Sequence, residues 1–552
     1  MNWTLRSEEQ IEEQSPEEII NILLHNRGIT DIDSFLNPSP EHFYDPFLLN
    51  NVREASERII SAIENREKIL IYGDYDADGI SAISLLLTTF RKLNAEVEYY
   101  IPHRLEEGYG LSEAGIRKAA DSGVNLIITV DCGTNAVEEI KLARDLGMEM
   151  IITDHHTPEK ENPCDIIINP KLSLDYPYKE LAGVGVAFKL SLGLEKMSNL
   201  SRNFLFWNLD LVALGTIADV MPLTGENRVI ATLGLKIMNE RKRPGINALL
   251  DMAGHKGKIK AHHIGFVLGP RINAIGRLTE AMEAVELLTT QNKIKARELA
   301  GILEKQNRER RKIQERIMKE AFRITTDKGI PLHENSIVLS DPGWHEGIVG
   351  IVASKIKETY YRPTILIAEN DDICRGSGRS ISEINIMETI EECKDYLEDF
   401  GGHPQACGIS IKKENIKDFR NAFNTAVGLK LKGKNLEPEL TIDSLLSIHP
   451  INKELIKKMD QLAPFGIGNP IPIFATFNLE VTTTPKIVGK NHLRFTVKEG
   501  NKILPAIAFS QGEKLDLLKK YSRIDIAYSP FIDEWRGEPT LKVHDIRGSN
   551  LV

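Results

Sequence analysis

Three aspartates stand at alternate positions in one short stretch of this sequence. Residues 74–79 read Asp-Tyr-Asp-Ala-Asp-Gly, and the three carboxylates can surround a hard cation. A calcium-binding EF-hand loop opens in the same way, but it needs a Glu at its twelfth position, where this chain has Leu85. It also needs a preceding helix, whereas residues 68–73 have the composition of a buried strand. The pattern therefore favours a catalytic metal site at the carboxyl end of a strand over a calcium loop.

Further potential metal ligands follow other apolar runs. Asp131 comes directly after a predicted strand at 125–130, and Asp154-His155-His156 comes after a predicted strand at 148–153. A helical stretch ends at Asp219. Because the carboxyl ends of parallel strands meet at one edge of a sheet, we expect these side chains to converge on one crevice. Clustered carboxylates repel one another unless a cation neutralises them, so the convergence predicts a metal centre.

The chemical types of these side chains indicate which metal they would hold. Carboxylates and imidazoles without thiolates disfavour structural zinc and favour Mn²⁺ or Mg²⁺, and the histidines favour Mn²⁺. The number of carboxylates indicates two ions, about 3.5–4 Å apart. Such a pair can activate a water, hold a scissile phosphate and stabilise the leaving oxygen, so no nucleophilic side chain is required.

The elements that must position these residues alternate between strand and helix. We predict a helix from 79 to 93 and five strands, at 68–73, 96–101, 125–130, 148–153 and 165–168. Strands this apolar are typical of a sheet that is buried on both faces. The predicted fold class is therefore α/β, with a doubly wound, mostly parallel sheet. Residues 181–250 are predicted to be mainly helical, and the charged segment 292–324 predicts a long helix that connects two domains.

Two further regions follow the connecting helix. A second α/β region is predicted at about 335–430, with strands at 336–340 and 363–368 and glycine-rich turns at 376–378 and 401–402. From about 472 onward, short strands alternate with Gly, Pro and Asn, which predicts a small β-barrel. We expect the boundaries to be an N-terminal segment at 1–45, a catalytic domain at 46–280, the connecting helix at 281–330, the second domain at 331–432 and the barrel domain at 433–552.

Composition limits the class of protein. Hydrophobic residues make up 41% of the 552 residues, which suffices for several packed cores. The five cysteines form no Cys-x-x-Cys pair and no signal-like apolar segment opens the chain, so we expect a cytoplasmic protein with reduced thiols. The net charge of −10 argues against nucleic-acid binding, but basic segments occur at 256–263 and 308–316. A solvated face explains such segments equally well.

The motifs together resemble the DHH phosphoesterases. The resemblance rests on the aspartate-rich stretch 74–79, Asp131-Cys-Gly133, Asp154-His155-His156 and Gly215-Thr-Ile-Ala-Asp219. Three longer stretches resemble the RecJ family of single-strand-specific DNA exonucleases. They are Gly269-Pro-Arg-Ile-Asn-Ala-Ile-Gly-Arg-Leu278, Gly376-Ser-Gly-Arg-Ser380 and Phe400-Gly-Gly-His-Pro-Gln-Ala406. The resemblance extends from about residue 45 to the C-terminus and implies a DHH domain, a DHHA1 domain and a C-terminal OB fold.

The resemblance implies a metal-dependent exonuclease of DNA repair and recombination. Such an enzyme degrades single-stranded DNA from the 5′ end and releases mononucleotides. The implied metal ligands are Asp76, Asp78, Asp131, His155 and Asp219. Asp74 would either join them or only support its turn, and His156 would contact the scissile phosphate.

Other residues are candidates for substrate binding. Arginine forks and backbone N–H groups in turns suit phosphate oxygens, although a surface salt bridge is the alternative for each arginine. The candidates are Arg104, Arg271, Asn273, Arg277, Ser377, Arg379 and His403. The resemblance assigns Arg277, Ser377 and Arg379 to the 5′-phosphate or the backbone. In the predicted barrel, Trp535 lies in a loop-like stretch and could stack on a base, whereas Phe531 is expected in the core.

Two alternative functions remain open for such a chain. A DHH enzyme for short oligonucleotides, cyclic dinucleotides or nucleotide phosphates would need neither the barrel nor the second linker. A scaffold with a decayed site is disfavoured because the ligand residues are intact. As partners, the resemblance implies single-stranded DNA, single-strand-binding protein and a DNA helicase. We expect a monomer without membrane contact.

Overall fold

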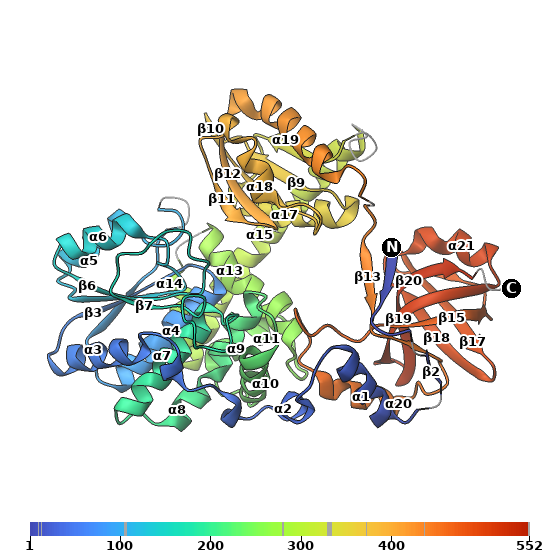
Figure 1. Cartoon of the computed structure of the whole chain (residues 1–552), viewed down its shortest axis with the longest axis horizontal. Helices are drawn as coiled ribbons and strands as arrows, with labels where there is room; N and C mark the ends of the chain where they lie inside the picture. The colour runs from blue at the N-terminus through green and yellow to red at the C-terminus, as the bar shows by residue number, and fades with distance from the viewer. Residues whose placement is uncertain are drawn as a thin grey trace.

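The chain folds into three bodies (Figure 1). The computed structural model describes residues 1–8, 10–12, 14–103, 107–278, 281–327, 334–370, 372–434 and 436–549, without the side chains of residues 277 and 278. The first body contains the predicted metal ligands, the second follows the long connecting helix, and the third contains a β-barrel. None of the described helices is both long enough and apolar enough to cross a membrane.

The first body is built on a five-stranded parallel sheet with the order β4-β3-β5-β6-β7. Its strands are β3 (Ile69–Gly73), β4 (Val97–Tyr100), β5 (Leu126–Val130), β6 (Glu149–Thr153) and β7 (Ile166–Ile168). The predicted strands and the predicted fold class are confirmed. Side chains alternate between the two faces, so Ile69 and Ile71 join the core under α4, while Leu70 and Tyr72 join a second core under α5 and α6. The flanking helices are α3 (Val52–Glu64), α4 (Ala77–Lys92), α5 (Glu113–Asp121) and α6 (Val137–Asp145).

A helical layer covers the α4 side of this sheet. It consists of α7 (Gly183–Met197), α8 (Arg202–Trp207), α9 (Leu209–Ala218), α10 (Gly225–Asn239), α11 (Pro244–Met252), α12 (Ala261–His263), η3 (Ile264–Leu268), α13 (Gly269–Leu278) and α14 (Met282–Thr289). Nearly all of α9 is buried, which agrees with its uniformly apolar sequence. From this layer α15 (Lys293–Asp327) extends into the second body, as its charged sequence predicts.

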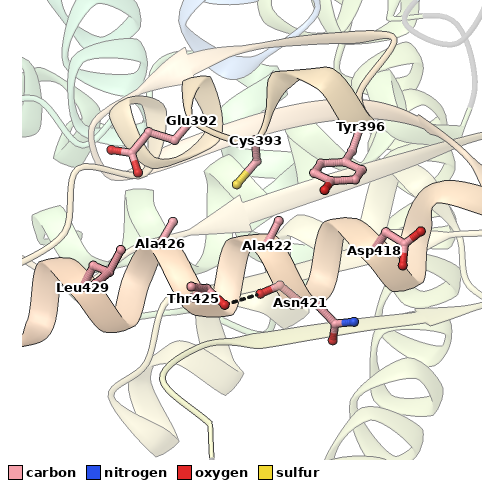
Figure 2. A pocket seen from close by; sticks show the side chains of 9 residues that line it. All are labelled: Glu392, Cys393, Tyr396, Asp418, Asn421, Ala422, Thr425, Ala426 and Leu429. Atoms are coloured by element: carbon pink, nitrogen blue, oxygen red, sulfur yellow. Dashed lines mark hydrogen bonds between the residues drawn. The ribbon is translucent and has the colours of Figure 1, made fainter.

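The second body is a mixed sheet with the order β11-β12-β10-β9-β8. Its strands are β8 (Ile337–Asp341), β9 (Thr364–Ala368), β10 (Ile373–Arg379), β11 (Asp399–His403) and β12 (Ala406–Lys412). Its helices include α17 (Glu346–Tyr360), α18 (Ile386–Glu391) and α19 (Ile416–Leu431). A shallow hollow between α19 and the turn that carries Cys393 and Tyr396 lies on the outside of this body (Figure 2).

The glycines of the second body do not form the turns that the sequence suggested. Gly376 and Gly378 lie inside β10, and Gly401 and Gly402 lie inside β11. An added Cβ at Gly376 would lie 2.8 Å from Ile409, and one at Gly378 would lie 2.8 Å from Ile386. The predicted turns were therefore wrong, because these β10 glycines serve close packing across the sheet rather than a change of chain direction.

The third body is a closed five-stranded barrel. Its strands are β15 (Phe474–Val481), β17 (His492–Glu499), β18 (Lys502–Ala508), β19 (Arg523–Asp533) and β20 (Glu538–Gly548). The barrel closes because β15 pairs with both β19 and β17. Shorter elements beside it are β13 (Glu439–Ile442), β14 (Ser444–Leu446), β16 (Lys486–Val488), α20 (Lys453–Met459) and α21 (Leu515–Lys520). The predicted C-terminal barrel is confirmed.

The N-terminal segment joins the third body. β1 (Asn2–Leu5) pairs in parallel with β13, and β2 (Gln10–Ile11) pairs with β14. α1 (Pro16–Asn26) packs on α20 and places Ile19 and Leu23 in the core of the barrel body. After α1, the guanidinium of Arg27 binds both carboxylate oxygens of Asp443, at 2.9 and 3.0 Å. The two ends of the chain therefore share one core.

A buried arginine connects the first and third bodies. Arg228 of α10 is 3% exposed, and its guanidinium donates to the carbonyl oxygens of Phe35, Leu462 and Ala463 at 2.8–3.1 Å. Nearby, the N–H of Leu223 donates to the carbonyl of Ile467 at 2.7 Å. These bonds fix the barrel body against the helical layer.

Candidate metal centre

The aspartate-rich stretch forms the start of a helix. β3 ends at Gly73 and α4 begins at Ala77, with Asp76 as the N-cap. The Oδ1 atom of Asp76 accepts hydrogen bonds from the N–H groups of Asp78 (2.8 Å) and Gly79 (3.1 Å). Asn273 of α13 accepts a further bond from the N–H of Ala77 at 2.7 Å. The turn is therefore held by helix capping, as the strand-end interpretation requires.

Asp78 is buried between two helices. Its Oδ2 and Oδ1 atoms accept from the N–H groups of Gly183 (2.6 Å) and Val184 (2.9 Å), at the N-terminus of α7. Burial, together with the nearby charge of Asp76, raises the pKa of Asp78 to about 7. The helix N-terminus partly offsets this cost by stabilising the carboxylate.

Asp131 occupies a strained backbone position at the end of β5. Its φ is 62°, in the left-handed region that non-glycine residues seldom adopt. α7 approaches so closely that an added Cβ at Gly183 would lie 2.6 Å from Oδ1 of Asp131. That buried Oδ1 accepts no hydrogen bond within the described part of the chain. Burial and the charges of Asp78 and Asp76 raise the pKa of Asp131 well above its usual value, so a cation is needed to stabilise its charged form.

The two histidines after β6 are organised by Asp154. Its Oδ1 accepts from the N–H groups of His155 (2.7 Å) and His156 (3.1 Å) and lies 2.7 Å from Nδ1 of His156. Its Oδ2 accepts from the N–H of Thr134 at 2.9 Å. Burial alone would raise the pKa of Asp154, but the bond to His156 outweighs this effect and lowers the pKa, so Asp154 stays charged. Although burial also opposes protonation of His156, its bond to Asp154 raises the pKa of His156.

His155 links the strand ends to α9. Its Nε2 atom lies 3.2 Å from Oδ1 of Asp131 and 3.7 Å from Oδ2 of Asp219, which caps the C-terminus of α9. Burial lowers the pKa of His155 to about 3, so the imidazole is neutral at pH 7. A neutral imidazole among carboxylates is the form that binds a divalent metal ion.

The predicted ligands meet at one place. In three sets of side chains, all potential ligand atoms lie within 4.8 Å of one another. The sets are Asp74, Asp76 and Asp131; Asp78, His155 and Asp219; and Asp131, His155 and His156. They overlap at Asp131 and His155, so the cluster can hold two neighbouring ions. The oxygen and imidazole ligands fit Mn²⁺ or Mg²⁺, as does Oδ1 of Asp131, which accepts no hydrogen bond within the described residues.

The second body contributes a side chain to the opposite wall. His403 of β11 lies over His156, with ring centroids 6.5 Å apart and an interplanar angle of 14°. Ser377 and Arg379 lie on one face of β10 beside α17, where an added Cβ at Gly350 would lie 3.2 Å from both side chains. The site thus lies between two bodies.

Three parts of the chain match known domains. Residues 68–216 match the DHH family, N-terminal domain. Residues 333–428 match the DHHA1 domain, and residues 442–545 match the RecJ OB domain. The chain is 40% identical to the single-stranded-DNA-specific exonuclease RecJ of Bacillus subtilis (strain 168), over 99% of this chain and 70% of that protein. It is 35% identical to the protein of the same name from Escherichia coli (strain K12), over 90% and 89% of the two chains.

The chain belongs to the RecJ family. The fold of RecJ from Thermus thermophilus in complex with Mn²⁺ matches the whole chain with a TM-score of 0.83 and 28% identity, and it is covered over 80% of its length. The Mg²⁺ complex of the same protein matches with a TM-score of 0.77 and 27% identity. That relative thus binds Mn²⁺ and Mg²⁺, the two ions that suit the donor set in this chain.

The remaining candidates for substrate binding in this RecJ family member lie in different structural environments. Arg271 is buried, with Nε 2.7 Å from Glu304 of α15 and Nη1 donating to the carbonyl of Val267 at 2.7 Å, so it also anchors α13. Asn273 holds the start of α4, as described above. Trp535 is 99% exposed in the β19–β20 turn. Arg104 and the side chain of Arg277 lie outside the described residues. Substrate binding by all of these residues remains a prediction.

Sequence reasoning missed the supporting roles of two residues. It named Asp154 only within a stretch of potential metal ligands after a predicted strand, whereas in the structure Asp154 orients both histidines. The hydroxyl of Tyr109 donates to the carbonyl of Asp131 at 3.1 Å and lies 3.1 Å from Nδ1 of His156. The Gly-Tyr-Gly stretch around residue 109 contains no sequence signal that predicts these two contacts.

Proposed function

We propose that the chain is a metal-dependent exonuclease that hydrolyses single-stranded DNA from the 5′ end and releases mononucleotides. The observation that carries the proposal is the meeting of six carboxylate and imidazole ligands, in a member of the RecJ family, at the wall between two bodies. Its relatives are named single-stranded-DNA-specific exonucleases.

The residues of the site would have two kinds of role in hydrolysis, metal binding and contact with the phosphate. Asp74, Asp76, Asp78, Asp131, His155 and Asp219 would hold two Mn²⁺ or Mg²⁺ ions. Such ions, when bound, activate water and stabilise charge on the phosphate oxygens. Asp154 keeps His156 oriented and favours its protonated form, so the imidazolium can donate to a non-bridging oxygen of the scissile phosphate.

The separation of the two walls supports preference for a single strand. His156 and His403 lie with their ring centroids 6.5 Å apart, one from each body. A B-form duplex is wider than its own major groove, which is about 12 Å across, so it does not fit between these rings. A separation of this size admits a single flat group, such as one base of an unpaired strand.

The polarity is proposed from the second body. Ser377 and Arg379 of β10, with Arg277, would bind the 5′-phosphate, and His403, Arg104, Arg271 and Asn273 would contact the adjacent backbone. A site that requires a terminal phosphate beside the metal ions cuts from that end. In this division of labour, residues 46–280 hydrolyse, 281–330 connect, 331–432 bind the strand end, and 433–552 bind the strand through the OB fold and Trp535.

The wider biological setting belongs to the same proposal. We infer a cytoplasmic monomer that acts in DNA repair and recombination, with single-strand-binding protein and a DNA helicase as partners. A helicase would supply the single strand that such an exonuclease consumes.

One assay tests the proposal. Single strands labelled at either end, the matching duplex and a dinucleotide are incubated with the protein in Mn²⁺ or in EDTA. We expect mononucleotides from the 5′ end of the single strand, only with metal, and no release from the blunt duplex. Release from the 3′ end would overturn the polarity, and turnover of the dinucleotide alone would favour a small-substrate phosphodiesterase.

A further inference from the structure

A surface on the helical layer of the first body has no role in the site described so far. It is formed by the turn between α10 and α11, the loop that follows α11, and the helical segment α12–η3. We call it the α11–η3 surface and define it by Arg241, His255, Lys256, Lys258, His262 and Phe266. All six are cationic or aromatic, in a chain whose net charge is −10.

Aromatic rings are exposed together on this surface. Phe266 is 82% exposed although it lies within η3, a π-helical turn of a kind that is frequent at functional sites. His262 is also exposed, and its ring centroid lies 3.8 Å from that of His263, which lies 4.0 Å from that of His255. Burial lowers the pKa of His262, and it lowers the pKa of His263 to about 4. These two imidazoles are therefore neutral, flat partners suited to stacking.

Cations surround these rings. Lys256 and Lys258 are exposed and line a hollow together with Arg241 and His255, where Asp251 is the only acidic lining residue among the described ones. Arg241 shapes the loop by donating to the carbonyl of Gly257 at 3.0 Å.

Two polar atoms of the same hollow are available to a ligand. The Nε2 atom of His255 and the Oδ1 atom of Asn247 are buried and have no hydrogen-bond partner within the described ranges. A ligand that offers both acceptors and donors, as a nucleotide does, could satisfy them.

The helical segment of this surface leads toward the metal centre. η3 continues directly into α13, and an added Cβ at Gly269 would lie 3.3 Å from the Cβ of Ala218, the residue before the predicted ligand Asp219. In Figure 1, α11 lies at the edge of the first body that is turned toward the C-terminal barrel. A strand that leaves the crevice toward the barrel would pass this edge.

We propose that the α11–η3 surface binds single-stranded nucleic acid, holding the part of the strand that extends beyond the catalytic crevice. The proposal rests on the proposed function and adds a second contact to it. Lysines neutralise the backbone phosphates, while Phe266 and the imidazoles stack on unpaired bases. An acidic polypeptide would use the lysines but leave the aromatic faces unused, and a duplex would hide its base faces.

Binding of short and long strands tests this inference. Fluorescence anisotropy is measured on the full chain in an Asp131→Asn background, with oligothymidylates of about 5 and about 20 nucleotides at several salt concentrations. We expect Lys256→Gln/Lys258→Gln to reduce the log–log salt slope for the long strand by about 1.4, since each phosphate contact on a single strand contributes about 0.7. Phe266→Ala should weaken long-strand binding about fivefold or more. The short strand should bind unchanged.

Controls separate this proposal from its rivals. Lys118→Gln/Lys141→Gln removes two exposed lysines from α5 and α6 of the same body and should change neither strand. Unchanged long-strand binding by the surface variants, or an equal loss in the control, would overturn the proposal. So would selective loss of poly-glutamate binding, which would identify an acidic polypeptide as the ligand. Failure of the chain with Asp131 intact to hydrolyse either strand would instead count against the proposed function.

Discussion

His156 and His403 lie nearly parallel across the boundary between two bodies, with ring centroids 6.5 Å apart. One ring follows β6 of the parallel sheet, and the other ends β11, an edge strand of the mixed sheet. The distance between these two rings therefore depends on how the second body is placed over the predicted metal ligands. Burial and the neighbouring His156 lower the pKa of His403, so a neutral ring faces a protonation-prone one.

Removal of His403 should impair catalysis without affecting the fold. We expect His403→Ala to lower kcat/KM for single-stranded DNA about tenfold or more, because the substrate loses one wall of the site. His403→Phe keeps a ring and separates stacking from hydrogen bonding. The exposed His449→Ala in the third body is the control. If His403→Ala has the kcat/KM of the wild type in steady-state assays, His403 is not part of the site.

Replacement of Asp131 should abolish turnover. Asp131→Asn removes the charge shared by two of the ligand sets, so we expect kcat to fall at least about 1000-fold, equivalent to about 4 kcal/mol. Calorimetry should detect fewer bound Mn²⁺ ions, while DNA binding and the melting temperature stay close to those of the parent chain. Residual activity within a few-fold of the parent would refute the assignment of Asp131 as a ligand.

The metal-free protein should lose stability as the pH rises. The folded pKa of Asp78 is about 7, above its ordinary 3.8, so the folded state holds more protons than the unfolded state between these values. Stability that is present below about pH 4 is then lost as the pH passes through about 7. Melting temperatures in EDTA should fall over this range, and Asp78→Asn should flatten the slope. Mn²⁺ should restore more stability at pH 8 than at pH 5, since binding requires deprotonated ligands.

Asp154 should act by positioning the histidines. Asp154→Asn weakens an acceptor of four hydrogen bonds, three of them from His155 and His156, so we expect a loss of about 10- to 100-fold in Mn²⁺ affinity or turnover. The pKa of His156, followed by NMR, should also fall. Asp165→Asn is the matched control, because that side chain is 93% exposed. An unaltered His156 titration would show that Asp154 does not orient this ring.

Trp535 should contribute to binding more than to chemistry. Its side chain is 99% exposed, and loss of one stacked base costs about 1–3 kcal/mol. Trp535→Ala should therefore raise Kd for single-stranded DNA about fivefold or more and leave the rate at saturating DNA nearly unchanged. Trp535→Phe should retain much of the affinity. Equal binding by the alanine variant would assign Trp535 to another role.

The parallel sheet and its ligands were predictable because their signals are local. Each buried strand is a short apolar run, and the predicted metal ligands Asp131 and His155 follow such runs within two residues. Parallel strands bring their carboxyl ends to one edge of the sheet, so side chains that follow different strands come together there. The long helix α15 was predictable from its charged sequence, in which apolar residues are sparse.

The failures came from distant contacts. The β10 glycines at 376 and 378 were assigned to a turn, because nothing nearby in the sequence reveals that Ile409 and Ile386 pack against them. The pairing of Asn2 with Glu439 joins residues more than 400 positions apart, and a short strand carries little signal of its partner. Tyr109 was missed for the same reason.

The barrel body brings together residues that lie more than 500 positions apart in the sequence. The ring of Trp3 lies 4.1 Å beneath the guanidinium of Arg547, and its Nε1–H donates to Asp545 at 2.8 Å. During translation, Trp3 leaves the ribosome 542 residues before Asp545, so it must wait for that residue and for Arg547 before it finds its native neighbours. Meanwhile the ribosome makes the first two bodies, which can fold as each emerges. The nascent chain can thus form the crevice between its first two bodies before its barrel is complete, and a ribosome that stalls early releases that crevice without the barrel.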